Sequence, residues 1–300
     1  MRFSFVQEKA RAFGTAAKIV PWLCLAGFLS GCTRFDVLNA TIPTCTYTRA
    51  TPLAYGDVPR QKLDIYRPRA LRPDAKPGAK VVVFFYGGDW QAGQKGDYRF
   101  VAEALASRGF VAVLPDYRLY PHVTFPKFVE DGALAVRWVH DHIDQFGGDP
   151  HQVYLMGHSA GAHIAALLTL DPHYLAAVGL EPKSIRATVT LSGPFDFLPG
   201  GTEREVFGMK PGDLPDPNIE PIHFANGRSA PMLLVQGQQD DVVIPDNATK
   251  LAAAIRRAGG RAEVLSYGKL GHAGTVLSMA WSFRWLAPVL RDTAAFINAH

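Results

Sequence analysis

The feature of this 300-residue chain that most restricts its fold is a regular alternation of short apolar runs with helical patterns. Expected strands occupy 62–66, 81–86, 110–114, 153–156, 187–191, 232–235 and 262–267. Helical patterns lie between them at 98–108, 128–146, 160–170 and 248–258. The run at 81–86 is apolar throughout, as expected of a strand that is covered on both faces. The alternation predicts an α/β fold with a mostly parallel central sheet and helices on both faces.

One segment, 193–230, interrupts this alternation with several Gly and Pro residues between two expected strands. Long irregular segments in a compact domain are often functional. We therefore expect a short cap insertion over a site around 193–230.

Composition and charge exclude several classes of protein. With 48% hydrophobic and 19% charged residues, the chain lacks the signature of disorder. It has no run of 18 apolar residues, which excludes a polytopic membrane protein. The formal net charge is +4, and the first 31 residues, with four basic residues and one acidic residue, account for three of these charges. The nearly neutral remainder predicts no binding to nucleic acid.

The sequence Gly-His-Ser-Ala-Gly at 157–161 indicates a turn that holds a reactive serine. It lies between the expected strand at 153–156 and an Ala-rich helix. Gly-x-Ser-x-Gly in this setting is typical of a nucleophile elbow, in which flanking glycines let the serine adopt strained backbone angles. The N-terminus of the helix then presents N–H groups to developing negative charge. Ser159 is therefore the candidate nucleophile.

A serine nucleophile needs a base and a group that orients the base, and after such an elbow they follow in the order acid, then histidine. Asp240 and Asp241 come after the expected strand at 232–235, and His272 comes after the strand at 262–267. Ligands of open α/β sheets bind at the carboxyl ends of strands, so we expect these residues to meet there. One of the two aspartates is expected to be an ordinary loop residue.

Further motifs make the chain similar to a group of α/β-hydrolase esterases. This group includes the hormone-sensitive-lipase type, acetyl and feruloyl esterases, kynurenine formamidases and isoprenylcysteine methylesterases. The motifs are Tyr-Gly-Gly-Asp-Trp at 86–90, Asp-Tyr-Arg-Leu at 116–119, Phe-Gly-Gly-Asp-Pro at 146–150 and the segment 154–165 around the elbow. The last resembles the isoprenylcysteine methylesterases most, and the similarity extends from residue 62 to about 275.

The resemblance implies an α/β-hydrolase fold and a serine hydrolase that cleaves carboxylic esters through an acyl-enzyme, without metal or organic cofactor. It implies that Ser159 is the nucleophile and His272 the base. The acid of the family stands three residues after a glycine, here Gly237, which favours Asp240 over Asp241.

The resemblance also implies an oxyanion hole made by the backbone amides of Gly88, Asp89 and Ala160. Tyr86 replaces a loop histidine of the family, which is not part of the triad. The carboxylate of Asp89 would be unfavourable near an anionic intermediate unless it points away or is paired.

Three other conspicuous polar residues, Asp116, Arg118 and Asp149, are expected to be structural. Arg118 can pair with a carboxylate and hold the loop after its strand. Asp149 precedes Pro150, a sequence typical of a turn.

The first 31 residues are typical of a secretion signal, because basic residues precede a short apolar stretch at 19–28. The stretch ends in Leu-Ser-Gly-Cys at 29–32, which resembles the bacterial lipobox. The resemblance implies cleavage before Cys32 and lipid attachment to its thiol, which anchors the protein to a membrane. An ordinary signal peptide, or an uncleaved anchor with a chance cysteine, is the alternative.

The predicted division of the chain is a lipoprotein signal at 1–31, a lipidated N-terminus and tether at 32–60, and a catalytic domain at 61–300. Thr33, rather than Asp, follows the cysteine. This resembles the pattern for sorting to the outer membrane in enteric-type cells, so we expect an envelope enzyme that faces the periplasm.

Two other functions remain open at this point. An amidase of the kynurenine-formamidase type would use the same triad on an N-formyl group, and comparing ester and formamide turnover would separate it. A non-catalytic lipoprotein scaffold is favoured by Tyr86 and Asp89 but opposed by the intact Ser–Asp–His set.

Overall fold

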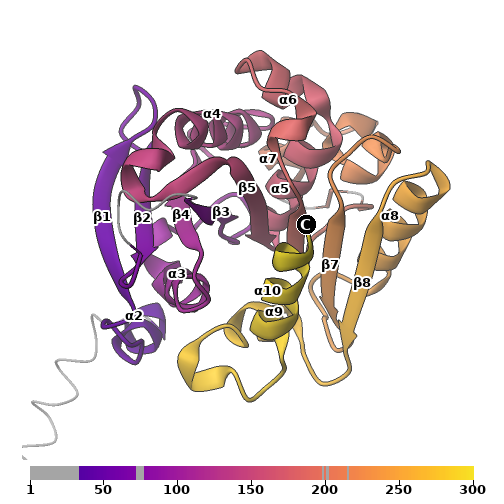
Figure 1. Cartoon of the computed structure of the whole chain (residues 1–300). Helices are drawn as coiled ribbons and strands as arrows, with labels where there is room; N and C mark the ends of the chain where they lie inside the picture. Colours follow the sequence, from indigo (N-terminus) through magenta and orange to yellow (C-terminus); the bar gives the residue numbers. More distant parts are fainter. Residues whose placement is uncertain (1–33, 72–77, 198, 201–202, 215) are drawn as a thin grey trace, which may run out of the picture.

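The structure, a computed structural model, describes residues 34–71, 78–197, 199–200, 203–214 and 216–300. Its centre is an eight-stranded sheet in the order β1-β2-β4-β3-β5-β6-β7-β8 (Figure 1). The strands are β1 (Tyr47–Ala54), β2 (Lys62–Pro68), β3 (Ala79–Phe85), β4 (Val111–Pro115), β5 (Gly148–His158), β6 (Thr188–Leu191), β7 (Met232–Gly237) and β8 (Ala262–Tyr267). β2 pairs antiparallel with β1 and β4, and every other pairing is parallel. The predicted mostly parallel sheet is confirmed.

Helices cover both faces of this sheet. The α-helices are α2 (Arg34–Ala40), α3 (Arg99–Ala106), α4 (Lys127–His142), α5 (Ala160–Leu170), α6 (Pro172–Ala177), α7 (Glu203–Val206), α8 (Asp246–Arg257), α9 (His272–Leu277) and α10 (Val289–Ala299). The 3₁₀ turns are η1 (Lys95–Tyr98), η2 (Ile143–Phe146), η3 (Pro182–Ser184), η4 (Pro217–Ile219), η5 (Pro221–Phe224) and η6 (Trp281–Phe283). α4, α5 and α6 pack together on one face, and α3 and α10 contact each other on the other. None of the described helices is long and apolar enough to cross a membrane.

The central strands form the core, which explains their continuous apolar sequences. All residues of β4, β6 and β7 are buried, as are the last five residues of β3. Burial of both faces requires apolar side chains at successive positions. Because β5, β7 and β8 run parallel, the loops that follow them leave from the same edge of the sheet.

The predicted tether over 32–60 is wrong for its described part, residues 34–60. β1 pairs with β2 from Tyr47 opposite Pro68 to Ala54 opposite Lys62, so this segment belongs to the sheet. The side chain of Asn39 in α2 accepts a hydrogen bond from the amide of Phe100 at 3.1 Å, which ties α2 to α3. Pro52 lies in β1, an edge strand, where the missing N–H is tolerated. The predicted signal at 1–31 and Cys32 lie outside the described residues.

The predicted cap insertion packs over the loop that follows β3. The described parts of 193–230 form only the short helical segments α7, η4 and η5. Phe207 contacts Trp90 edge-on, with ring centroids 4.9 Å apart, and Phe197 stacks on it at 6.2 Å. The insertion is therefore held against the Tyr-Gly-Gly-Asp-Trp segment by aromatic contacts.

Candidate active site

Ser159 occupies a strained turn between β5 and α5, as the elbow motif predicts. Its backbone angles are φ 53° and ψ −123°, a region that residues with a side chain rarely adopt. A Cβ on Gly157 would lie 2.2 Å from the carbonyl oxygen of Gly161, and a Cβ on Gly161 would lie 2.1 Å from that of Phe85. The close approach of these backbones therefore requires both glycines.

The three residues predicted as a triad come together at the carboxyl edge of the sheet. His272, the first residue of α9, has Nε2 2.9 Å from Oγ of Ser159. Its Nδ1 is 3.1 and 3.0 Å from the two carboxylate oxygens of Asp240. With Nδ1–H donating to Asp240, Nε2 carries the lone pair that can accept the serine proton. Asp241 is exposed, and it is Asp240 that the structure places against the histidine.

The carboxylate of Asp240 is buried but well supplied with hydrogen bonds. It accepts from the amides of Val242 and Val243 at 3.1 and 2.8 Å, and from Nε2 of Gln236 at 2.9 Å. Burial alone would raise the pKa of Asp240, but the hydrogen bonds from His272 and Val243 outweigh it and hold the pKa below its ordinary value. Asp240 is thus ionised at neutral pH and can orient the imidazole.

Sequence reasoning missed the part played by His158, the residue before the serine. Its buried ring donates from Nε2 to the carbonyl oxygen of His272 at 3.2 Å. Burial, together with the neighbouring His272, lowers the pKa of His158 to about 3. The ring stays neutral and holds the backbone of His272 without adding a second positive charge. The one sequence signal for this role was the position of His158 inside the Gly-x-Ser-x-Gly motif.

The loop after β3 lies beside the nucleophile, since a Cβ on Gly87 would be 3.0 Å from Cβ of Ser159. Gly88, Asp89 and Trp90 have φ values of 133°, 52° and 59°. Among the described residues, the amides of Gly88 and Asp89 have no hydrogen-bond acceptor, and Ala160 is the first residue of α5. Asp89, Ser159 and Ala160 line one cavity of about 400 Å³, which we call the Ser159 cavity. The side chain of Asp89 is exposed, so water screens its charge.

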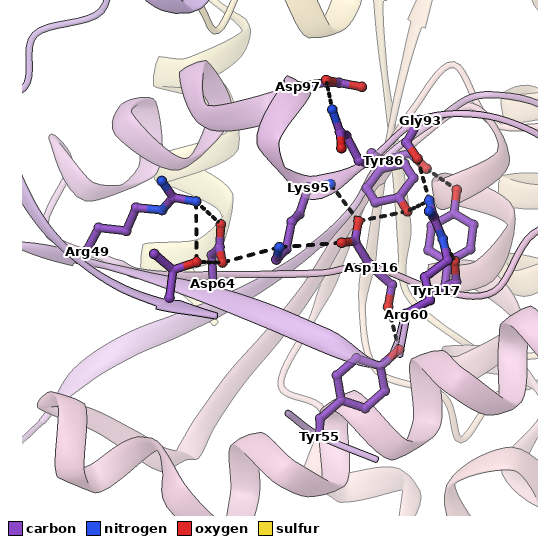
Figure 2. A network of polar contacts seen from close by, with 12 residues as sticks. Arg49, Tyr55, Arg60, Asp64, Tyr86, Gly93, Lys95, Asp97, Asp116 and Tyr117 are labelled. Carbon is purple, nitrogen blue, oxygen red and sulfur yellow. Dashed lines mark hydrogen bonds and ion pairs between the residues drawn. The ribbon is translucent and has the colours of Figure 1, made fainter. Parts of the chain in front are cut away.

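Tyr86, at the position of the family's loop histidine, is buried in the polar network of Figure 2. Its hydroxyl accepts a hydrogen bond from Arg60 at 2.9 Å and donates one to Asp116 at 3.1 Å. Arg60 also donates to the carbonyl oxygen of Gly93, and Asp116 accepts from the amide of Lys95 at 2.7 Å. The loop from 87 to 95 is therefore fixed from both ends by one set of side chains.

The same network reaches the N-terminal strand. Nζ of Lys95 lies 3.5 Å from Asp64 and 3.4 Å from Asp116. Asp64 is fully buried and also pairs with Arg49 and Thr51 of β1 (Figure 2). The segment predicted as a tether thus supports the loop beside the nucleophile.

The residues expected to be structural do have structural contacts. Arg118 pairs with the buried Asp131 at 2.8 Å, and Asp149 accepts a hydrogen bond from the amide of His151 at 2.8 Å. Within the described ranges, no group of three His, Cys, Asp or Glu residues could hold a metal ion.

We expect Tyr86→Phe to lower kcat about tenfold while changing KM less than twofold. The hydroxyl joins Arg60 to Asp116, and removing it costs about 1–3 kcal/mol and releases the amides of the loop. Steady-state kinetics on a soluble ester measure the effect. Tyr154→Phe is the matched control, because Tyr154 is equally buried and, within the part of the chain that the structure describes, its hydroxyl bonds only Gln152. Equal kcat values in the two variants would contradict the role of the network.

Comparisons with known proteins agree with the resemblance to esterases that the sequence motifs indicate. The BD-FAE family model matches residues 63–255. The probable isoprenylcysteine α-carbonyl methylesterase of Oryza sativa subsp. japonica is 32% identical over 242 residues, which cover 74% of this chain and 58% of that protein. Esterase LipC of Mycobacterium tuberculosis is 30% identical over 271 residues, which cover 84% and 65%. The chain thus spans between about half and two thirds of the length of these relatives.

Solved structures agree on the architecture. A truncated carbohydrate esterase from gut microbiota has a TM-score of 0.74 at 21% identity, over 86% of this chain and 98% of that chain. Thermogutta terrifontis esterase 2 with bound butyrate has a TM-score of 0.69 at 25% identity, over 83% and 94%. The predicted α/β-hydrolase fold is confirmed, and since the family model covers most of the sequence, the chain belongs to the BD-FAE family.

Proposed function

We propose that the protein is a serine hydrolase that cleaves carboxylic esters through an acyl-enzyme. The observation that carries this proposal is the chain of hydrogen bonds from Oγ of Ser159 through His272 to Asp240. Beside it lie two loop amides that have no acceptor among the described residues. The names of the relatives, which are esterases and methylesterases, support the substrate class.

In the first half of the reaction, Oγ of Ser159 attacks the ester carbonyl carbon while Nε2 of His272 takes the serine proton. The carbonyl oxygen becomes an oxyanion, which the amides of the loop and of Ala160 stabilise by hydrogen bonds. The intermediate then collapses, the bond to the alcohol oxygen breaks, and His272 returns the proton to the leaving alcohol.

In the second half, His272 accepts a proton from a water molecule that attacks the acyl group on Ser159. The bond to Oγ breaks, the carboxylic acid leaves, and the serine regains its proton. Asp240 stays ionised throughout and stabilises the imidazolium that forms twice in each cycle.

A fluorophosphonate probe tests the nucleophile directly, because it phosphonylates an activated serine. The purified protein should gain one label, and peptide mapping should place it on Ser159. Comparing ester and N-formyl substrates of equal size then tests the reaction, and we expect faster turnover of the ester. A label on another serine, or preference for the formamide, would contradict the proposal.

The lipobox motif supports a further part of the proposal, that Cys32 carries the lipid and anchors the enzyme to the outer membrane, facing the periplasm. The wild type should partition with membranes and take up labelled fatty acid. Cys32→Ser should lose both, yet keep ester hydrolysis within about twofold, since the described fold starts after this residue. Wild-type protein in the cytosol, unlabelled and with residues 1–31 intact, would refute the anchor without affecting the triad.

A further inference from the structure

A second cavity, of about 460 Å³, is lined by His158 of the elbow and by residues of α9 that follow His272. Its wall combines the loop after β3, α9 and the N-terminal helix α2, and we call it the α2 cavity. The residues that carry the inference are Phe35, Leu38, Gly88, His158, Ala273 and Leu277.

The reaction centre lies at the boundary between the two cavities. Gly88 and His158 line the α2 cavity, whereas the residues that directly follow them, Asp89 and Ser159, line the Ser159 cavity. The elbow and the loop after β3 therefore lie between the two cavities.

Chemistry assigns one half of the ester to each space. The acyl carbon must reach Oγ of Ser159, which lines the Ser159 cavity. The alcohol oxygen must instead receive its proton from His272, and the next residue, Ala273, lines the α2 cavity. An alcohol half that leaves on the side of Ala273 would extend toward α2.

The α2 cavity suits an apolar group of considerable size. Phe35, Leu38 and Leu277 are joined in its lining by further apolar side chains, and Asp97 is the one charged residue among those that line it in the described chain. Phe283, also in the lining, is 36% exposed, and Trp281 and Trp285 beside it are 57% and 77% exposed. Apolar surface thus continues from the cavity to the outside.

We propose that the α2 cavity binds the alcohol half of the substrate, and that the preferred substrates are esters of large apolar alcohols. This inference rests on the ester hydrolysis proposed above. Methanol or ethanol would leave most of the cavity unfilled, whereas each buried CH₂ contributes about 0.8 kcal/mol, or about fourfold in kcat/KM.

Two ester series measured on the full chain test this inference. In the first, acetate esters carry alcohols from methyl to octyl, and kcat/KM should rise about fourfold per CH₂ until the cavity is full. In the second, ethyl esters carry acyl groups of the same lengths. A flat alcohol series from an active enzyme overturns the cavity assignment alone, whereas no Ser159-dependent hydrolysis of any ester ends the proposed function with it.

Substitutions that fill one cavity at a time test which cavity binds the alcohol half of the ester and which binds the acyl half. Leu277→Trp should lower kcat/KM for the octyl ester at least tenfold and leave the methyl ester within twofold. Phe283→Trp enlarges a side chain of the same lining that is 36% exposed, and it should act in the same direction if the first variant does not fold. Ile244→Trp is the matched control, because Ile244 lines the Ser159 cavity and is 58% exposed.

The control should change the acyl series and leave the alcohol series as in the wild type. If Leu277→Trp and Phe283→Trp instead change the acyl series, the two halves of the ester lie the other way round and the inference is wrong.

Discussion

Ser159→Ala is expected to lower kcat/KM for ester hydrolysis by about 10⁴-fold or more and to leave the thermal midpoint within a few degrees. The variant loses the attacking oxygen and with it the covalent intermediate. In the folded protein that oxygen makes one described side-chain hydrogen bond, to His272, whose loss costs about 1 kcal/mol. Hydrolysis assays and thermal unfolding of the same preparation measure both quantities.

A buried serine outside the triad provides the control for this variant. Ser278 is buried, and its hydroxyl donates to the carbonyl oxygen of Gly274 within the same region. Ser278→Ala should keep activity within about threefold at a similar small cost in stability. Full activity in Ser159→Ala would leave the proposed mechanism without its nucleophile.

Asp240→Asn is expected to lower kcat by up to about 10⁴-fold, because an amide that donates to Nδ1 stabilises the wrong tautomer of His272. The substitution keeps an oxygen for the amides of Val242 and Val243, so the loop should remain in place. Steady-state kinetics at neutral pH measure the loss.

Asp241→Asn is the matched control, since it removes the neighbouring charge from an exposed position. Its kcat should stay within about twofold of the wild type. Reversed effects in the two variants would mean that Asp241, and not Asp240, orients the histidine.

The strands β2 to β8 could be predicted from the sequence because most are buried on both faces and therefore read as continuous apolar runs. β1 could not, because it is an edge strand with mostly half-buried or exposed side chains and a proline at position 52. α2 has seven residues, fewer than a hydrophobic period needs to stand out. Both elements therefore resembled a linker.

The triad was predictable for a topological reason. Ser159, Asp240 and His272 each follow a strand of one parallel sheet, so sequence order alone brings them to one edge. The network around Tyr86 could not be predicted from the sequence. Arg60 and Asp116 reach Tyr86 through the antiparallel pairing of β2 with β4 and through the path of the loop after β3. Tyr86 replaces the histidine of the family, and its hydroxyl has both a donor, Arg60, and an acceptor, Asp116.

The position of α2 limits where an anchored enzyme could work. Two peptide units separate Cys32, the proposed lipid attachment site, from Arg34, the first residue of α2, so a chain of this length spans at most about 7 Å. Phe35 and Leu38, which line the α2 cavity, would then lie beside the lipid headgroups. An enzyme anchored this closely would bind apolar esters from the thin surface layer of the membrane, where they accumulate. Its effective substrate concentration would then be set by partitioning of the ester into that layer rather than by solubility of the ester in water.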